Sequence, residues 1–349
     1  MMDDAFAARA GEWLAPGGPA NDIVVSTRIR LARNLRGHKM PWRLAESERD
    51  ALAHHLRERL SSTHAVPEAT YWNIAQLSEV ERLLLVERHL ISRELAAGKG
   101  HRGVLFSPRE SLSVMTLEED HLRLQSIRCG LQLDVAWREL AQVDNEVERA
   151  VPYAVSSRFG YLTACPTNVG TGLRVSVMTH LPTLVQTRQI KKVKQATSKV
   201  GLVLRGLYGE GTKAYGDFYQ ISNQVTFGRS EEEILQQVQD MVGKIIDWER
   251  GVRSLLLERD RIGLEDRIWR AWGTLKMARR ISSEDAMEQL SSVRLGVNTK
   301  VLGEVSLQTL NELFLFIQPA HLQILRQAPD EAAHRDAVRA RFIREHLAG

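Results

Sequence analysis

The spacing of apolar residues changes once along this 349-residue chain, near residue 230. Before that point, short alternating segments such as GVLFS (103–107) and LRLQSIR (122–128) predict β-strands, which are separated by loops rich in glycine. After it, apolar residues recur at helical spacing over long segments, which predicts helices. We therefore expect an α+β fold with a flexible leader at 1–20, a mixed part at 21–245 and a helical part at 246–349.

The mixed part also contains segments with helical spacing. A capping-box pattern at Ser47 marks the start of one of them, and Gly98 follows the end of another. We expect helices at 47–60, 77–97, 135–147 and 186–199.

Charge and cysteine content exclude several classes of protein. Lysine and arginine number 47 and aspartate and glutamate 43, so the net charge is only +4, and no long basic run indicates direct nucleic-acid binding. The two cysteines, Cys129 and Cys165, form no CxxC pair, which argues against a structural zinc site and favours a reducing compartment. Without an apolar signal segment or a run long enough to span a membrane, we expect a cytoplasmic protein.

The common nucleotide-binding and metal-binding motifs are missing from the sequence. The string nearest to a P-loop is GLYGEGTK, in which Thr212 precedes Lys213, the reverse of the required order. The catalytic-loop and DFG motifs of ordinary protein kinases do not occur, and neither does HExxH. Any phosphate chemistry must therefore use another set of residues.

The segment S-T-R-I-R combines cationic side chains at a spacing of two. In an extended strand, Ser26, Arg28 and Arg30 point to the same face. Two arginines on one face repel each other unless an anion lies between them, and a polyphosphate would fit there. The alternative is a solvated basic face of an edge strand.

A compact acidic cluster, Glu118-Glu119-Asp120-His121, is followed by Arg123. Adjacent carboxylates raise each other's pKa unless a cation compensates, and a guanidinium group would do so. A solvated acidic turn is the simpler alternative.

Two loops rich in glycine are candidates for contact with an anionic substrate. The first runs from Cys165 to Gly172, directly before Arg174, and its backbone N–H groups could face an anion. The second contains Arg205 and Glu210 and could bring both charges to a substrate. Plain turns explain both loops equally well if each is taken alone.

In combination, these segments resemble a known family. The chain carries, in the family's order, five strings found in the ATP:guanido phosphotransferase (phosphagen kinase) family: STRIRLARN, EEDHLRLQ, CPTNVGTGLRVSV, RGLYGEG and YQISNQ. The string CPTNxGTG is highly specific, and the resemblance covers about residues 21–245. The helical part resembles the family's bacterial protein-arginine kinase branch, through NELFLFIQPAHLQ from Asn311 and the run Arg335–Ala340.

The resemblance implies an antiparallel sheet flanked by helices, and roles for particular residues. Glu119 and Glu210 would bind and orient the acceptor guanidinium, and Cys165 would lie beside the reactive nitrogen. Leu117 stands where small-guanidino kinases usually have Asn, which could alter the acceptor site. The residues implied in nucleotide binding are Ser26, Thr27, Arg28, Ile29, Arg30, His89, Arg123, Arg174, Val175, Ser176, Val177, Met178, Arg205, Gly206, Leu207, Tyr208, Gly209 and Glu210.

The activity implied by the resemblance is transfer of the γ-phosphoryl group of ATP, with Mg²⁺ bound mainly through the nucleotide, to arginine side chains of proteins. Small-guanidino kinases carry an additional helical domain before the catalytic part. Because S-T-R-I-R already begins at residue 26, we expect an acceptor site open to a protein side chain. The alternatives are a small-molecule guanidino kinase and a non-catalytic adaptor that binds phosphoarginine.

For the helical part, the resemblance implies regulation and assembly. A phosphoarginine pocket would be formed by Arg335, Asp336, Arg339 and Ala340, although a solvated basic helix face is the simpler interpretation of this spacing. The aromatic residues Trp248, Trp269, Trp272, Phe314 and Phe316 fit either a homodimer interface or an internal core. The implied partners are a zinc-binding activator protein, a Clp protease and a heat-shock repressor, in protein quality control and the stress response.

Overall fold

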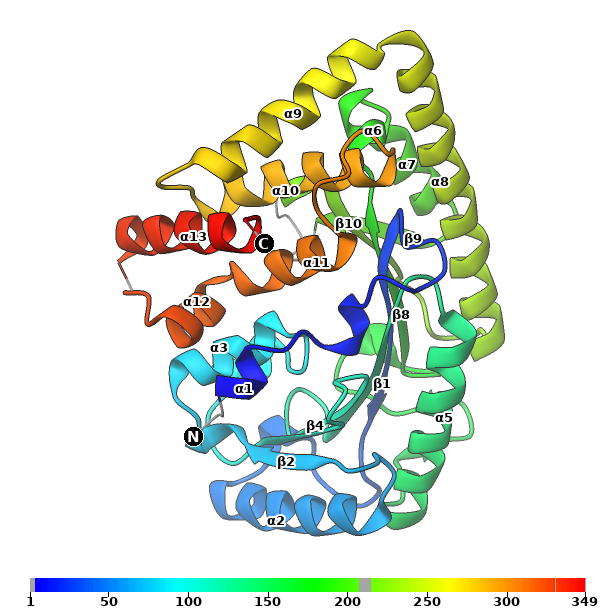
Figure 1. Ribbon diagram of the computed structural model, residues 1–349. Coiled ribbons are helices and arrows are strands. Elements are labelled where there is room, and N and C mark those ends of the chain that lie inside the picture. Colours follow the sequence, from blue (N-terminus) through cyan, green and yellow to red (C-terminus); the bar gives the residue numbers. More distant parts are fainter. Residues whose placement is uncertain (1–3, 207–214, 330, 349) are drawn as a thin grey trace.

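The computed structural model describes residues 4–206, 215–329 and 331–348. Within these ranges an eight-stranded antiparallel sheet, in the order β2-β3-β4-β5-β1-β8-β10-β9, forms the centre of the molecule (Figure 1). The strands predicted from 103–107 and 122–128 are confirmed as β3 and β5. The strands of this sheet are β1 (Val24–Arg33), β2 (Thr70–Asn73), β3 (Gly103–Phe106), β4 (Leu112–Thr116), β5 (Leu122–Cys129), β8 (Leu173–His180), β9 (Leu202–Gly206) and β10 (Phe218–Asn223); β6 (Val155–Ser156) and β7 (Gly160–Tyr161) form a separate hairpin.

One face of the sheet is covered by helices that bury the first hydrophobic core. Ile29 of β1 and Val175 of β8 are fully buried there against Leu140 of α5 and Val238 of α8. The helices associated with this core are α2 (Glu46–Thr63), α5 (Leu133–Ala150), α6 (Pro182–Gln186), α7 (Ile190–Lys199) and α8 (Glu231–Arg259).

The C-terminal helices build a second core against the opposite face of the sheet. Ile127 of β5 and Met178 of β8 are buried in this core together with Leu290 and Phe314. Helix α8 runs without a break through residue 246, the expected boundary, and leads into these helices (Figure 1). They are α9 (Arg261–Met277), α10 (Ser283–Asn298), α11 (Leu307–Phe316), α12 (Pro319–Arg326) and α13 (Ala332–His346).

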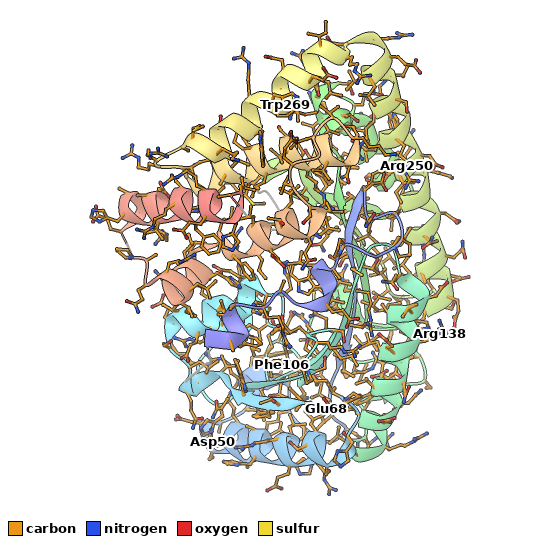
Figure 2. All side chains as sticks on the ribbon, in the orientation of Figure 1. Asp50, Glu68, Phe106, Arg138, Arg250 and Trp269 are labelled. Atoms are coloured by element: carbon orange, nitrogen blue, oxygen red, sulfur yellow. The ribbon has the colours of Figure 1, made fainter. Side chains whose placement is uncertain are left out.

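Most of the aromatic residues proposed for an interface are used inside the chain. Trp272, Phe314 and Phe316 are buried in the second core, and Trp248 donates from Nε1 to Gln189 at 3.1 Å. Trp269 is the exception, since 44% of it is exposed on α9 (Figure 2). Contacts within the chain therefore account for the positions of Trp248, Trp272, Phe314 and Phe316.

The described part of the expected leader packs onto the protein. It contains α1 (Asp4–Ala7) and the 3-10 turn η1 (Glu12–Leu14), and the Trp13 side chain is fully buried in the second core. The Leu14 carbonyl accepts from Asn311 Nδ2 of α11 at 2.6 Å. These contacts fix the segment between the sheet and the C-terminal helices.

The helix expected at 47–60 is confirmed as α2, but its capping box uses Glu48, which accepts from the Ala45 N–H, and not Ser47. Two other helix predictions need correction. The helix expected at 77–97 is two helices, α3 (Glu79–Glu87) and α4 (Arg93–Ala97), because the backbone turns into the left-handed region at His89 (φ 59°). A left-handed Arg188 likewise separates α6 from α7 within the expected 186–199. No helix in the described ranges is long and apolar enough to cross a membrane.

Candidate active site

The alternation of β1 places three polar side chains on the sheet face opposite α5 and α8. Ser26, Arg28 and Arg30 share this face, as their spacing predicts. The antiparallel register then sets Ser26 opposite Met178 and Arg30 opposite Arg174. Directly paired residues have side chains on the same face, so the two neighbouring strands present one continuous polar surface.

Two further strands add arginines to the same surface. Arg123 of β5 pairs with Ala32, and Arg205 of β9 pairs with Gln220 of β10, which itself pairs with Met178. We call this surface the arginine face; its five arginines are Arg28, Arg30, Arg123, Arg174 and Arg205.

Burial and mutual repulsion act on these guanidinium groups together. Burial, followed by the charge of Arg123, lowers the pKa of Arg28 to about 10. Burial and then Arg28 lower the pKa of Arg30 well below its usual value, and burial and then Arg205 lower that of Arg174. A concentration of like charge in a partly dry site favours the binding of an anion.

Two of the arginines have hydrogen-bonding capacity to spare. Within the described ranges, the Arg28 guanidinium has only long contacts, 3.5 Å to Ser176 Oγ and 3.4 Å to Gln220 Oε1. Arg30 Nε is buried without a hydrogen-bond partner among the described residues. Buried donors are normally satisfied, so these groups fit the oxygens of a bound phosphate chain.

A small pocket at one end of the arginine face is lined by His89. It is bounded by Ser26, Arg28, Ile127, Ser176, Met178 and Gln220. The His89 ring lies 4.9 Å from the Trp13 ring in an edge-on arrangement. Burial, with Arg28 and Arg30, lowers the pKa of His89 to about 3, so the imidazole is neutral at physiological pH. The pocket itself has a volume of only about 10 Å³, so it provides a neutral, partly aromatic contact beside the cationic surface rather than a cavity for a whole nucleoside.

Four of the residues expected to bind nucleotide have side chains on the other face. Thr27, Ile29, Val175 and Val177 are fully buried toward the first core. Thr27 Oγ1 donates to the Gly130 carbonyl at 2.7 Å. The strand alternation therefore excludes these side chains from the arginine face and leaves Ser26, Ser176 and Met178 on it.

The two glutamates of the acidic cluster differ in their exposure to solvent. Glu118 is buried and pairs with Arg123 Nη1 at 2.8 Å, and Ser92 Oγ donates to its other oxygen. Glu119 lies 3.5 Å from Arg123 Nη2 and its side chain is 45% exposed. Burial and then Asp120 raise the pKa of Glu119. Glu119 is therefore the carboxylate of the pair that an external cation can reach.

Asp120 and His121 hold the backbone around the cluster. Asp120 Oδ1 accepts from Asn34 Nδ2 and from the Ala164 N–H, both at 2.6 Å. The His121 ring accepts from the Leu35 N–H at 3.2 Å through Nδ1. These bonds join the acidic cluster to β1 and to the segment that leads to Cys165.

The Cys165 loop is tied to the arginine face by Arg174. Its guanidinium donates to Asn168 Oδ1 at 2.9 Å, to Thr167 Oγ1 at 2.8 Å and to the Asn223 carbonyl at 2.8 Å. Cys165 Sγ lies 3.0 Å from the same Thr167 hydroxyl. Arg174 thus positions the half-buried thiol at the edge of the face.

The second glycine-rich loop is only partly described. Arg205 and Gly206 end β9, whereas Leu207, Tyr208, Gly209 and Glu210 lie outside the described residues.

The residues expected to bind phosphoarginine belong to α13. Arg339 is buried and donates to the Ile317 carbonyl at 3.0 Å, to the Ile281 carbonyl at 3.1 Å and to Asp336. Ala340 is also buried, while Arg335 and Asp336 are half-buried. In this arrangement Arg339 joins α13 to the end of α11, through Ile317, and to the segment before α10, through Ile281.

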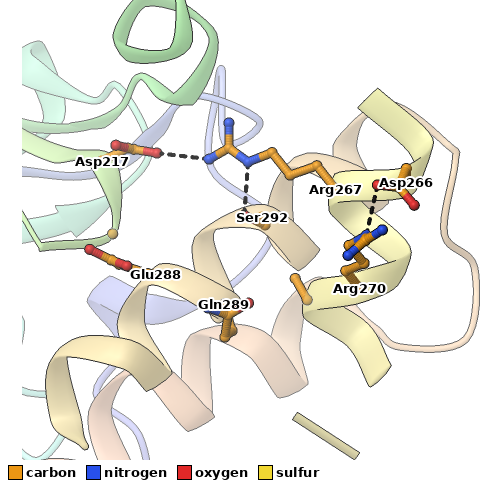
Figure 3. Close-up of a pocket in the computed structure, with 9 residues that line it drawn as sticks. Asp217, Asp266, Arg267, Arg270, Glu288, Gln289 and Ser292 are labelled. Atoms are coloured by element: carbon orange, nitrogen blue, oxygen red, sulfur yellow. Dashed lines mark hydrogen bonds and ion pairs between the residues drawn. The ribbon is translucent and has the colours of Figure 1, made fainter. Parts of the chain in front are cut away.

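A cavity of about 660 Å³ lies at a separate place, between the 3-10 turn η5 (Tyr215–Asp217), α9 and α10 (Figure 3). Asp217 lies on one wall, where it accepts from Ser291 Oγ at 3.3 Å and is 3.6 Å from Arg267 Nη2. None of the five arginines of the arginine face lines this cavity. Among the described residues, no group of three or more His, Cys, Asp or Glu side chains is arranged to hold a metal ion.

Sequence reasoning missed several residues that support the site. Gln220 lines the pocket, Ser92 holds Glu118, Trp13 packs against His89, and Gln125 donates to the His89 carbonyl at 2.7 Å. Gln220 lies within the string YQISNQ, so its position in that string was a usable signal. The others are single polar or aromatic residues whose roles depend on tertiary contacts.

Comparisons with known proteins identify the family of this chain. The family model of the ATP:guanido phosphotransferase C-terminal catalytic domain matches residues 51–252, so the chain belongs to the ATP:guanido phosphotransferase family. Two solved structures share the fold. A lombricine kinase has a TM-score of 0.59 and 27% identity, with 71% of this chain and 72% of that chain covered. The duplicated taurocyamine kinase of Schistosoma mansoni with bound transition-state analogue components has a TM-score of 0.61 and 28% identity over 72% of this chain, which spans only 37% of that longer chain.

A narrower placement follows from the helical part and from whole-chain relatives. The model of the protein-arginine kinase McsB C-terminal domain matches residues 261–349. A protein-arginine kinase of Moorella thermoacetica is 44% identical over 344 residues, 98% of both chains, and one of Halothermothrix orenii is 44% identical over 347 residues, 99% of both. Within the family, the chain therefore belongs with the protein-arginine kinases.

Proposed function

We propose that this protein transfers the γ-phosphoryl group of Mg-ATP to arginine side chains of other proteins, giving phosphoarginine. The observation that carries the proposal is the convergence of five arginines from four strands on one sheet face, with a reachable carboxylate and a thiol at its edge. The whole-chain relatives named protein-arginine kinase support the same acceptor.

The nucleotide side of the reaction needs alignment and neutralisation of charge. His89, at the small pocket, would contact the nucleoside, and Arg28 and Arg30 would donate to the phosphate chain. Arg123, Arg174 and Arg205 would surround the transferring group and stabilise the negative charge that develops on it. Because these side chains are fixed on a sheet, little reorganisation is required during transfer.

The acceptor side must activate a poor nucleophile. An arginine guanidinium has a pKa above about 12 and is protonated when it binds. Glu119 would grip its N–H groups, orient one nitrogen in line with the γ-phosphorus and take a proton as the attack proceeds. Glu210 would supply the second carboxylate, and Cys165 would lie beside the reacting nitrogen.

Mg²⁺ fits this site as part of the nucleotide complex. The arginine face presents cationic donors, which repel a free metal ion, so the phosphate oxygens of ATP would supply most of its ligands. When bound, the ion would neutralise charge on the phosphates.

The acceptor can be identified in a single assay. The protein is incubated with Mg-ATP and unfolded casein, with free arginine in a parallel tube, and phosphate is mapped by mass spectrometry without acid treatment. Phosphoarginine on casein, lost in Glu210→Ala, is the expected result. Phosphate on free arginine alone would instead indicate a small-molecule guanidino kinase. Absence of transfer to both acceptors, together with binding of a phosphoarginine peptide, would indicate an adaptor.

We further propose that residues 246–349 serve in homodimerisation and phosphoarginine sensing. Arg335, Asp336, Arg339 and Ala340 would form the sensing pocket, so that product on one molecule activates another. The proposed setting is cytoplasmic protein quality control, with a zinc-binding activator protein, a Clp protease and a heat-shock repressor as partners.

A further inference from the structure

Helix α3 ends in a motif that normally requires glycine. The His89 N–H donates to the Val86 carbonyl and the Leu90 N–H to the Leu85 carbonyl, both at 3.0 Å, which is the Schellman pattern. The residue in the left-handed position of this motif is usually glycine, because side chains disfavour that conformation. Here it is His89, with φ 59°. The conformation turns the imidazole toward Trp13 and the small pocket, so other contacts must hold it.

The residue before His89 is held by a fully buried polar network. Arg88 has no exposed surface, and its Nε donates to the Glu110 carboxylate at 3.1 and 3.2 Å. Its Nη2 donates to the Arg9 carbonyl and to Glu110, and its Nη1 lies 3.3 Å from His321 Nε2. Every nitrogen of this guanidinium therefore has a partner, and one of these partners belongs to α12.

His321 joins this network to the first turn of α12. Its Nδ1 lies 2.7 Å from a Glu87 oxygen, and the Glu87 carboxylate also accepts from the N–H groups of Ala320 at 2.9 Å and of His321 at 3.1 Å. A proton on Nδ1 satisfies Glu87 and leaves Nε2 as the acceptor for Arg88. The neutral ring thus bridges a carboxylate and a guanidinium that are consecutive residues at the end of α3.

We propose that His321 and Glu87 are positioning residues for nucleotide binding. They act through Arg88 to fix the left-handed turn that aims His89 into the nucleotide pocket. The proposal rests on the proposed function, since it takes His89 as a contact of bound ATP. It assigns to α12, a helix far from the arginine strands in sequence, an indirect part in the affinity for ATP.

The network reaches further into the helical part. The Ile317 carbonyl, at the end of α11 and just before α12, accepts from Arg339 Nε of α13 at 3.0 Å. A series of contacts therefore runs from α13 to the start of α12, and from α12 through Glu87 and Arg88 to His89. By linkage, if docking of α12 favours ATP, ATP must favour docking of α12 to the same extent.

The first test is the affinity for ATP, measured by calorimetric titration of the full chain under conditions in which no phosphoryl group is transferred. We expect His321→Ala to raise the dissociation constant by about tenfold, the scale of one lost positioning interaction. His89→Ala should weaken binding similarly, and the double variant should bind no more weakly than His89→Ala, because His321 acts only through His89. His101→Ala is the matched control, since His101 pairs with Asp50 at the same 2.7 Å but is exposed. It should bind ATP like the parent.

A second readout separates positioning from simple stabilisation of the fold. Amide hydrogen exchange of α12 should slow when ATP binds the parent, and this protection should be lost in Glu87→Gln. His321→Gln, whose amide can still accept from Arg88, should retain most of the affinity and is the conservative control. Glu87→Gln should weaken ATP binding, and it serves as the test if His321→Ala does not fold.

Two outcomes would overturn the proposal in distinguishable ways. If His89→Ala weakens ATP binding but neither His321→Ala nor Glu87→Gln changes it by more than about twofold, the network is structural only. If the parent itself does not bind ATP, the proposed function fails and this inference falls with it.

Discussion

Arg30 of β1 and Arg174 of β8 are direct cross-strand partners in the antiparallel register. Like charges placed directly opposite each other destabilise a sheet. Burial makes both charged groups still less favourable, and the pKa of Arg30 and of Arg174 is therefore lowered. Arg174 is stabilised by four protein acceptors, whereas Arg30 retains a buried Nε without a hydrogen-bond partner among the described residues. The two guanidinium groups therefore repel each other in the ligand-free protein, and a bound polyphosphate would neutralise this repulsion.

The first prediction concerns Arg30→Ala. Removal of the repelling charge should raise the free energy of unfolding of the ligand-free protein by about 1 kcal/mol, while ATP affinity falls at least about tenfold. Urea unfolding and ATP titration measure the two effects. Arg138→Ala is the control, because Arg138 lies on the outer side of α5 (Figure 2) and its guanidinium donates to the Asp134 carbonyl of the same helix at 3.4 Å. Loss of both stability and affinity in Arg30→Ala would contradict the prediction.

The second prediction separates Glu119 from Glu118. Glu119→Gln should lower turnover by about 10²–10⁴ with ATP affinity retained, because the lost group acts on the acceptor. Glu118→Gln should instead weaken ATP binding, since it releases Arg123 from its 2.8 Å ion pair. Steady-state kinetics with casein and ATP titration distinguish the two. Full turnover in Glu119→Gln would exclude the proposed role.

The raised pKa of Glu119 also predicts a pH effect. A carboxylate that takes a proton must be ionised, so activity should be lost as the pH falls through its pKa, which lies above the ordinary 4.5. The acid limb of the pH profile of kcat should therefore shift or disappear in Glu119→Gln.

The third prediction concerns the cavity of Figure 3. Burial raises the pKa of Asp217 from 3.8 to about 6, against the opposing effect of Arg267. The folded state then binds more protons than the unfolded chain between about pH 4 and 6, so stability should fall as the pH rises through this window, by at most about 3 kcal/mol. Asp217→Asn should be less pH-dependent there. Chemical denaturation at pH 4, 5, 6 and 7 measures the free energy of unfolding at each pH. The same dependence of this free energy on pH in the parent and in the variant would refute the prediction.

The fourth prediction separates folding from sensing on α13. Arg339→Ala should cost about 3 kcal/mol of unfolding free energy, because it leaves two buried carbonyls and Asp336 without their donor. Arg335→Ala should cost less than about 1 kcal/mol and should lower activation by added phosphoarginine, with ATP binding unchanged. An unchanged phosphoarginine response in both Arg335→Ala and Asp336→Ala would exclude the proposed pocket.

Local spacing determined much of this protein. Period-two alternation places Ser26, Arg28 and Arg30 on one face, and the same alternation sends Thr27 and Ile29 into the core. The change from strand to helix spacing predicts the α+β fold, and the order of the motifs indicates the family. These features depend on neighbours along the chain, which is why they could be predicted.

Tertiary structure alone decided which charged residues meet. The arginines of β1, β5, β8 and β9 share a surface only because the sheet order brings together strands that are far apart in sequence. Arg33 and Arg88 resemble them in the sequence, yet each is buried in a structural network, with Asp144 and Glu110 respectively. Register and burial are properties of the whole fold, and the cost of an unpaired buried charge then fixes whether an arginine supports the protein or remains free to bind a ligand.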